Sequence, residues 1–311
     1  MNSCMTYSFI IPHHNTPDLL QRLIDSIPQR EDIEIIVVDD NSEDDKKANI
    51  SRSDVRTIFI DKEHTKGAGR ARNVGMDAAT GKWFLFADAD DFYKPNFIDV
   101  LDEYNNDDID ILFFNVDTVD NDTLEPIKEY RSDFHQRLFK EFDGSQESID
   151  KFLFWGYGPW RKMVSRRLVE KYGLFFEEIA VSNDSFFSLQ TSYFAKKWKK
   201  DERVLYSLTL YKNSLTYSPV NKKKYSAYLY LFPRRREFFS FIGHSDWNKK
   251  SPKGRNSQSC LKYCYKLLKK DFTTGVMATL YYLIHYRDIE NKSDYYVKVI
   301  KEMELRNNDN E

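Results

Sequence analysis

Two short apolar segments of this chain each run directly into acidic residues. Ile33–Val38 is followed by Asp39 and Asp40, and Trp83–Ala87 is followed by Asp88–Asp91, in which three of the four residues are Asp. Segments this short and this apolar are typical of strands buried on both faces of a sheet. The acidic side chains would therefore lie at the carboxyl ends of two buried strands.

The surrounding segments predict a mostly parallel sheet. Strand-like runs alternate with helix-like runs throughout residues 7–120. This alternation is typical of α/β proteins in which helices cover the sheet. Three further strands are expected, at Tyr7–Ile11, Thr57–Ile60 and Ile109–Phe114, and Pro12 should end the first of them. One helix is expected to start at Thr16 and another to span Arg70–Thr80, with Gly67 and Gly69 in the loop before it.

In open α/β sheets, ligands bind at the carboxyl ends of the strands. We therefore expect Asp39 and Asp40 to share one crevice with Asp88, Asp90 and Asp91. Crowded carboxylates repel each other unless a cation or hydrogen-bond donors compensate them. A divalent ion such as Mg²⁺ or Mn²⁺ that bridges to phosphate is the usual solution. For Asp39, a turn or helix-cap role is the alternative.

Composition excludes several classes of protein. Of the 311 residues 41% are hydrophobic, so the chain is globular rather than disordered. Its longest apolar runs, such as Ala278–Ile284, fall far short of the roughly 20 residues of a membrane-spanning helix. No leader-like segment follows Met1, and we expect a cytoplasmic protein. The three cysteines (Cys4, Cys260, Cys264) suggest a reducing cytosol rather than a disulfide scaffold. For Cys260 and Cys264 the prediction is buried thiols rather than a metal site.

Charge is distributed unevenly along the chain. Residues 221–311 carry 19 Lys and Arg against 10 Asp and Glu, a balance of +9, whereas the whole chain carries −2, which leaves −11 for residues 1–220. The acidic front part is consistent with a carboxylate-rich site that needs cations. The basic rear part suggests contact with an anionic partner.

Four segments resemble, in order and spacing, the successive signatures of the family 2 glycosyltransferases. They are Ser-Phe-Ile-Ile-Pro (8–12), Ile-Val-Val-Asp-Asp-Asn-Ser (36–42), Gly-Arg-Ala-Arg-Asn-Val-Gly (69–75) and Ala-Asp-Ala-Asp-Asp (87–91). A weaker likeness to the acceptor-side half of the family continues through residues 158–162, 176–179, 183–184 and Tyr211–Thr216.

The resemblance implies an inverting enzyme with the GT-A fold, a Rossmann-like, mostly parallel sheet flanked by helices. That domain would cover residues 1–220, with a donor half of about 1–120 and an acceptor half of about 121–220. Residues 221–311 would form a mainly helical C-terminal extension.

The resemblance also implies nucleotide-sugar-binding residues. It assigns Pro12, His14 and Asp40 to the base and ribose, with Asp40 accepting from a ring N–H of a uracil-type base. His14 has the alternative of a solvent-facing loop residue. Arg72 would approach the diphosphate with paired donors. Asp88 would contact the ribose or a metal-bound water.

Asp88 and Asp90 match the family's Asp-X-Asp motif, which implies a divalent cofactor, Mn²⁺ or Mg²⁺. Asp90 would ligate the ion, with Asp88 beside it, and Asp91 would be a further ligand or a cap for the helix near Asn96. The cation would neutralise the diphosphate as the sugar–phosphate bond breaks.

An acceptor hydroxyl needs a general base, and the resemblance assigns Asp184 to this catalytic role. The family often has Glu-Asp at this point, whereas this chain has Asn183 before Asp184. Loss of the like charge favours a less elevated pKa for Asp184. The alternatives are a helix N-cap role for Asp184, or Glu177 or Glu178 as the base.

Trp160 and Lys162 are assigned to acceptor binding. Trp155, Tyr157 and Trp160 lie in a Gly-punctuated segment that suits either an exposed platform for sugar rings or the core. Lys162 lies where the family often has a basic residue near the acceptor or a phosphate. The Gln-X-X-Arg-Trp segment of processive synthases is absent, so one sugar per acceptor is expected.

The rear segment is expected to be helical, basic and aromatic, broken near Pro233 and at Ser251–Gly254. Such a segment fits peripheral contact with the inner face of an anionic membrane, where a lipid-linked acceptor would be found. A simply solvated helical face is the alternative. No motif supports nucleic-acid binding.

We therefore expect a metal-assisted hexosyl- or N-acetylhexosaminyl-transferase that moves one sugar, preferably from a UDP-sugar, to a carbohydrate or lipid-linked acceptor in polysaccharide biosynthesis. One alternative is a nucleotidyltransferase, although residues 12–15 lack the Gly-rich, Lys-bearing loop it would need. The other is a non-catalytic relative that binds sugar nucleotides. The sequence does not specify the sugar, acceptor, linkage or oligomeric state.

Overall fold

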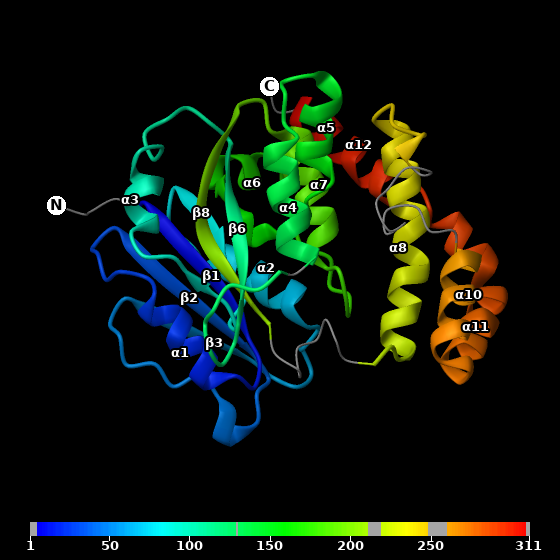
Figure 1. Ribbon diagram of the computed structural model, residues 1–311, viewed down its shortest axis with the longest axis horizontal. Coiled ribbons are helices and arrows are strands. Elements are labelled where there is room, and N and C mark those ends of the chain that lie inside the picture. The colour runs from blue at the N-terminus through cyan, green and yellow to red at the C-terminus, as the bar shows by residue number, and fades with distance from the viewer. Residues whose placement is uncertain (1–4, 129, 211–218, 248–259, 309–311) are drawn as a thin grey trace. The chain divides into compact units, whose positions relative to one another are not determined.

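An eight-stranded mixed sheet forms the N-terminal part of the protein (Figure 1). The computed structural model describes residues 5–128, 130–210, 219–247 and 260–308. The strand order is β3-β2-β1-β4-β7-β6-β8-β5, with four parallel and three antiparallel pairings. The strands are β1 (Tyr7–His13), β2 (Ile33–Asp40), β3 (Val55–Ile60), β4 (Trp83–Phe86), β5 (Phe92–Tyr93), β6 (Ile111–Asp120), β7 (Lys162–Ser165) and β8 (Trp198–Leu210).

Helices accompany the sheet and make up the C-terminal region. Those up to residue 194 are α1 (Pro17–Asp25), η1 (Asp44–Lys46), α2 (Ala68–Ala78), α3 (Phe97–Asp102), α4 (Tyr130–Lys140), α5 (Gln146–Phe154), η2 (Pro159–Arg161), α6 (Arg166–Tyr172) and α7 (Asp184–Phe194). Those of the C-terminal region are α8 (Lys222–Phe241), α10 (Cys260–Lys270), α11 (Phe272–Asn291) and α12 (Tyr295–Asn308). The predicted α/β class is confirmed.

The predicted strands of the donor half are all present, with shifted ends. The strand β1 runs two residues beyond its predicted end at Ile11, because its pairing with β2 continues to His13 opposite Asp39. Its pairing with β4 ends earlier, at Ile10 opposite Phe86. Gly69, predicted in a loop, lies inside α2.

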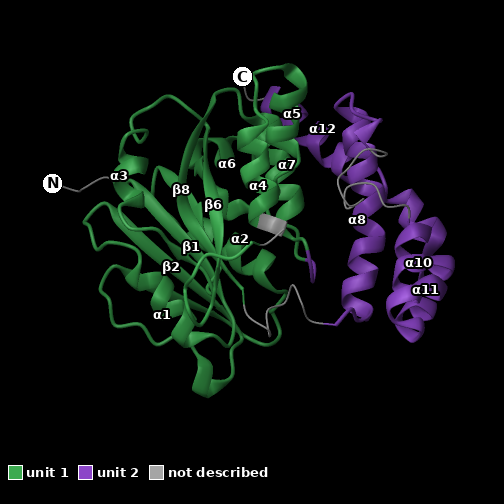
Figure 2. Cartoon of the chain, viewed as in Figure 1, with its two compact units in different colours: residues 1–178, 182–214 green, residues 179–181, 215–311 purple. Residues whose placement is uncertain are grey.

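The chain forms two compact units (Figure 2). Unit 1 comprises residues 1–178 and 182–214, and unit 2 comprises residues 179–181 and 215–311. The division falls a few residues before the predicted boundary at 220. The predicted break near Pro233 is wrong, because α8 continues through this residue. The predicted motif 211–216 and the predicted break at 251–254 lie outside the described residues. Within the part of the chain that is described, none of the helices combines the length and apolarity needed to cross a bilayer.

Candidate active site

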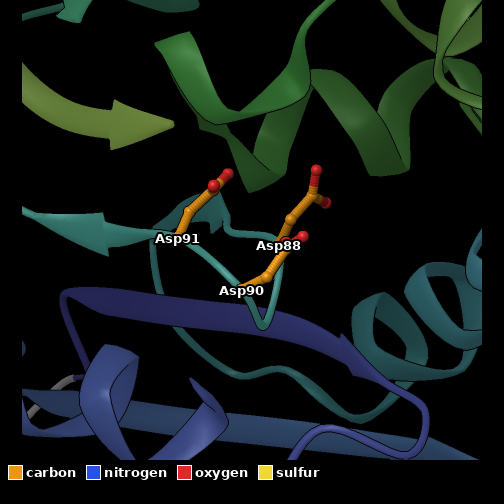
Figure 3. A group of neighbouring side chains, drawn as sticks. All are labelled: Asp88, Asp90 and Asp91. Atoms are coloured by element: carbon orange, nitrogen blue, oxygen red, sulfur yellow. The ribbon is translucent and has the colours of Figure 1, made fainter. Parts of the chain in front are cut away.

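A cluster of three carboxylates lies on the turn that follows β4 (Figure 3). Asp88, Asp90 and Asp91 each offer a carboxylate oxygen, and these oxygens lie within 4.8 Å of one another. Asp91 is buried, whereas Asp88 and Asp90 are half-buried. Carboxylate oxygens gathered in this way are the ligand set that Mg²⁺ and Mn²⁺ prefer. The residues therefore fit the predicted divalent cation.

Strand β8 holds this acidic turn in place. The Tyr206 hydroxyl donates to Asp91 at 2.9 Å and accepts from the backbone N–H of Asp88 at 2.9 Å. The backbone N–H of Thr209 donates to the other oxygen of Asp91 at 2.7 Å. Both oxygens of Asp91 are thus occupied by protein donors, which makes it an anchor of the turn. The proposed cap role of Asp91 is wrong, since Asn96 occupies the N-cap position of α3.

Arg72 connects the acidic turn to the start of α7. One terminal nitrogen donates to Asp88 at 2.5 Å, and the other donates to the side-chain oxygen of Asn183 at 2.8 Å. The guanidinium also lies over the ring of Phe176, 5.3 Å from its centroid. Asn183 directly precedes Asp184, the predicted base. Arg72 therefore links the predicted metal-binding motif to the residue that precedes the predicted base.

Close packing of α2 fixes the position of Arg72. A Cβ on Gly75 would lie 2.4 Å from the Ile10 side chain, and one on Gly69 would lie 2.1 Å from the carbonyl oxygen of Glu177. Asn73 exchanges two hydrogen bonds with the backbone of Phe176, at 2.9 and 2.8 Å. Only glycine allows the helix to approach strand β1 and the segment before α7 this closely.

The two acids after β2 have different surroundings. Asp39 accepts hydrogen bonds from the backbone N–H groups of Ser42 (2.8 Å) and Ala48 (3.0 Å) and lies 2.9 Å from the ring of His13. Burial opposes ionisation of Asp39, but these hydrogen bonds outweigh it and lower its pKa. Asp39 therefore has the structural role offered as its alternative.

Asp40 ties β2 to the start of α2. Its carboxylate accepts from the hydroxyl of Thr65 at 2.6 Å and from the backbone N–H of Gly67, the N-cap residue of α2, at 2.9 Å. His14 is exposed, and its Nδ1 donates to the backbone oxygen of Asp40 at 2.9 Å. The half-buried Pro12 lies in β1, opposite Val38 of β2. The predicted base-binding residues thus gather at the carboxyl ends of β1 and β2.

Asp184 is the first residue of α7, and Asn183, not Asp184, occupies the N-cap position. The cap role for Asp184 is therefore wrong. A carboxylate in the first helical turn is stabilised by the helix dipole. Of the alternative bases, Glu177 is buried, and Glu178 pairs with Lys66 at 2.7 Å.

Lys162 is fully buried near Asp184. Its ammonium lies 3.5 Å from the Thr191 hydroxyl of α7. Burial lowers the pKa of Lys162 well below its usual value, the adjacent Arg161 lowers it further, and Asp184 offsets part of this change. In this structure Lys162 offers no surface to an acceptor.

Of the three aromatic residues before β7, Trp155 and Trp160 belong to the core, whereas Tyr157 is half-buried. Trp155 and Trp160 are 9% and 5% exposed, so the exposed platform offered as one alternative is not present. Trp160 stacks on Tyr206, with ring centroids 6.1 Å apart. A stacking role of Trp160 toward a sugar ring would need its face uncovered, which the Tyr206 contact prevents. Trp160 therefore supports the tyrosine that anchors the acidic turn.

Sequence reasoning missed Arg161, which is fully buried among three aromatic rings. Its guanidinium lies 4.8 to 5.5 Å from the ring centroids of Phe152, Phe113 and Phe139, and burial lowers its pKa to about 9. One terminal nitrogen lies 3.2 Å from Nδ1 of His135. No local signal in the sequence identifies this cluster, because its members come from β6, α4, α5 and η2.

Unit 2 has a cavity of its own, of about 380 Å³. Its lining includes the cationic residues Lys223, Arg234 and Lys292 but none of the predicted site residues. In the same unit Cys260 and Cys264 are buried free thiols, as predicted.

Comparison with known proteins agrees with this geometry. The model of glycosyl transferase family 2 matches residues 8–173. The putative glycosyltransferase EpsH of Bacillus subtilis is 26% identical over 242 residues, 74% of this chain and 68% of EpsH. The poly(ribitol-phosphate) beta-glucosyltransferase of Bacillus spizizenii is 27% identical over 202 residues, which are 62% of this chain and 30% of that protein.

Among solved structures, S. aureus TarS 1-349 in complex with UDP-GlcNAc has a similar fold. The TM-score is 0.57 and the sequence identity 17%, over 97% of this chain and 92% of that one. This likeness confirms the GT-A fold. Because the family model covers more than half of the sequence, the chain belongs to glycosyl transferase family 2. Its activity is glycosyl transfer, with a carboxylate cluster compatible with the family's Asp-X-Asp motif.

Proposed function

We propose that the protein transfers a single sugar with inversion from a UDP-sugar to a carbohydrate or lipid-linked acceptor, with a divalent cation held by the acidic turn. The observation that carries this proposal is the pair of hydrogen bonds from Arg72 to Asp88 and to Asn183. They link the residues that would hold the donor phosphates to the residue that would activate the acceptor.

The donor assignment follows from the carboxyl ends of β1 and β2. A nucleotide base would lie against Pro12 and His14, and a carboxylate oxygen of Asp40 would accept its imide N–H in addition to its present donors, because a carboxylate has about four lone-pair sites. The TarS structures with UDP-GlcNAc and with UDP support a UDP-linked donor on a similar fold.

Asp90 and Asp88 would hold Mn²⁺ or Mg²⁺, and Asp91 would keep their turn attached to β8. When bound, such a cation stabilises the negative charge that develops on the leaving diphosphate. Arg72 contributes positive charge on the same side. Arg72 is buried and already paired with Asp88, so its role would be to orient that carboxylate. Any contact of Arg72 with a donor phosphate would use the same guanidinium.

Asp184 would act as the general base that takes the proton of the acceptor hydroxyl. Attack from the face opposite the diphosphate inverts the anomeric configuration. The buried Lys162 side chain lies near this carboxylate, and the interaction between the two groups favours the charged form of Lys162. We therefore propose that Lys162 and Trp160 act on the acceptor side indirectly, by positioning Asp184 and the acidic turn.

The names of two relatives support a lipid-linked or polymeric acceptor. One, from Campylobacter jejuni, is a GalNAc(5)-diNAcBac-PP-undecaprenol beta-1,3-glucosyltransferase, 39% identical over 90 residues (27% of this chain, 29% of that protein). The Bacillus spizizenii relative is named for poly(ribitol phosphate). Both names are consistent with hexosyl transfer to a lipid-linked or polymeric acceptor.

The experiment that tests this proposal is calorimetric titration of the full chain with UDP, GDP and CMP, with and without Mn²⁺. UDP binding that requires Mn²⁺ is expected, with its loss in Asp90→Asn. Asp184→Asn should retain UDP binding and lose roughly 10²–10⁴-fold of transfer to an acceptor found by screening UDP-sugars. Unchanged Mn²⁺-dependent binding by Asp90→Asn would overturn the metal assignment, and normal transfer by Asp184→Asn would overturn the base. Nucleotide binding without turnover would favour a non-catalytic relative.

A further inference from the structure

One side of helix α11 carries large apolar side chains in solvent. Met277, Leu280, Leu283 and Ile284 are 51%, 49%, 61% and 76% exposed. We call these four residues the α11 apolar face. The spacing 277, 280, 284 places three of them in one stripe along the helix. The buried residues of α11, Gly275, Ala278, Tyr282 and Ile289, lie on the opposite side.

This exposure is concentrated rather than scattered. Among the described residues, eleven large hydrophobic side chains are exposed, and eight of them lie within residues 260–291, on α10 or α11. The four besides the α11 apolar face are Leu261, Tyr265, Phe272 and Tyr286. Single exposed apolar residues are ordinary, whereas a contiguous group marks a surface that another phase or partner covers.

Helix α10 adds positive charge next to this face. Its sequence, Cys260–Lys270, contains four exposed lysines and no acidic residue. The lysines are Lys262, Lys266, Lys269 and Lys270. The two helices lie side by side (Figure 1) and are closely packed, since a Cβ on Gly275 of α11 would lie 2.3 Å from the backbone nitrogen of Leu268. Lysines and apolar side chains therefore belong to one rigid helical pair.

The acidic residues of this helical pair have local partners. Asp271 caps α11 by accepting from Thr274, Asp288 pairs with Lys292 at 2.8 Å, and Glu290 pairs with Arg236 at 3.3 Å. All three of these partners lie outside α10.

We propose that α10 and α11 form a docking surface for an anionic lipid bilayer. The α11 apolar face would enter the boundary between headgroups and acyl chains, while the lysines of α10 contact lipid phosphates. A second copy of the chain fits this surface less well, because a two-fold symmetric contact uses the same surface twice and α10 brings lysines but no acidic residue to it. The proposal deepens the proposed function, on which it rests for the lipid-linked acceptor.

Vesicle co-sedimentation of the full chain tests this surface. The unmodified protein should sediment with phosphatidylglycerol–phosphatidylcholine vesicles and weakly with phosphatidylcholine alone, and high salt should reduce the difference. Leu280→Ser/Ile284→Ser should lower the partition coefficient by about tenfold or more. Replacing the four α10 lysines by Gln should remove the preference for anionic vesicles. The matched control is Phe59→Ser/Leu305→Ser, since these residues are 56% and 63% exposed outside this surface.

Equal sedimentation of the control and of Leu280→Ser/Ile284→Ser would overturn the proposal. So would a dimer, seen by light scattering, that Leu280→Ser/Ile284→Ser converts to a monomer without any change in vesicle binding. Mn²⁺-dependent UDP binding, measured on the same variants, is expected to stay unchanged. Failure of vesicle binding is thereby distinguished from failure of the proposed function.

Discussion

Arg72 donates a 2.8 Å hydrogen bond to the side chain of Asn183, which lies 111 residues further along the chain. This contact accounts for the amide at a position where the family often has Glu. The amide oxygen accepts from the guanidinium without adding a negative charge next to Asp184.

Replacing Asn183 tests this interpretation. Asn183→Asp keeps the shape and the acceptor, so we expect the fold and transfer to survive. The added charge should shift the acid limb of the pH profile of kcat/KM upward by about one pH unit, because a neighbouring carboxylate raises the pKa of Asp184. Asn183→Ala should instead leave a buried guanidinium N–H unsatisfied and cost about 1–3 kcal/mol of the free energy of unfolding. An unaltered pH profile in Asn183→Asp would contradict the proposed role of Asp184.

Tyr206→Phe should weaken the metal-dependent binding of nucleotide. The change removes the hydroxyl that donates to Asp91 and accepts from the N–H of Asp88, so the acidic turn loses two hydrogen bonds. We expect a loss of about 1–3 kcal/mol in unfolding free energy and a higher Kd for UDP with Mn²⁺. The matched control is Tyr104→Phe, whose hydroxyl donates to Asp201 instead. Equal effects of the two variants on the Kd would show that Tyr206 does not position the turn.

Gly69→Ala should lower the rate of sugar transfer more than its loss of stability alone would explain. Its Cβ would meet the backbone of the segment that leads to Asp184, whereas the Cβ of Gly75→Ala would meet the Ile10 side chain in the sheet. Both variants should lose about 1–3 kcal/mol through overpacking. At equal stability, kcat should fall further in Gly69→Ala. If kcat fell equally in Gly69→Ala and Gly75→Ala at equal stability, the contact of Gly69 with the segment before Asp184 would have no special role in transfer.

Lys162→Met should stabilise the protein at neutral pH, because burying an ammonium costs free energy that a buried methionine avoids. Burial gives folded Lys162 a lowered pKa, so the unfolded chain binds more protons between that pKa and the ordinary lysine value near ~10.4. The stability of the unmodified protein therefore rises with pH through this window, and the advantage of Lys162→Met shrinks. Urea unfolding at several pH values measures this difference, with the exposed Lys196→Met as control. If the difference in unfolding free energy between Lys162→Met and the unmodified protein did not change with pH, the lowered pKa of Lys162 would be contradicted. Lower transfer in the stabilised variant would support a positioning role.

The donor half could be predicted in detail because its signals are local. Each strand and the acid that follows it are contiguous in sequence. Because β2, β1 and β4 are parallel neighbours, the strand pattern was enough to place Asp40 and Asp88 at the same edge of the sheet. Asp39 could not be separated from Asp40 in this way, since the donors that distinguish them, Ser42 and Ala48 for Asp39 and Thr65 and Gly67 for Asp40, come together only in the folded chain.

The acceptor half was less predictable because its important contacts are distant in sequence. Tyr206 and Arg161 acquire their surroundings only when strands from both ends of unit 1 pair. Burial of Trp160 and Lys162 likewise depends on this packing, and no periodic pattern precedes it. The sequence therefore indicated residues near the site without revealing which of them face a ligand.

The anchoring of the acidic turn by β8 determines where this enzyme can be truncated or joined to a relative in a chimera. The family match ends at residue 173, yet Asn183, Tyr206 and Thr209 all contact the machinery inside that match. A fragment that stops at the family boundary would retain every signature of the donor half and lose the tyrosine and the backbone amide that hold Asp91. Chimeras that exchange donor specificity between relatives should therefore carry residues 174–210 together with the donor half.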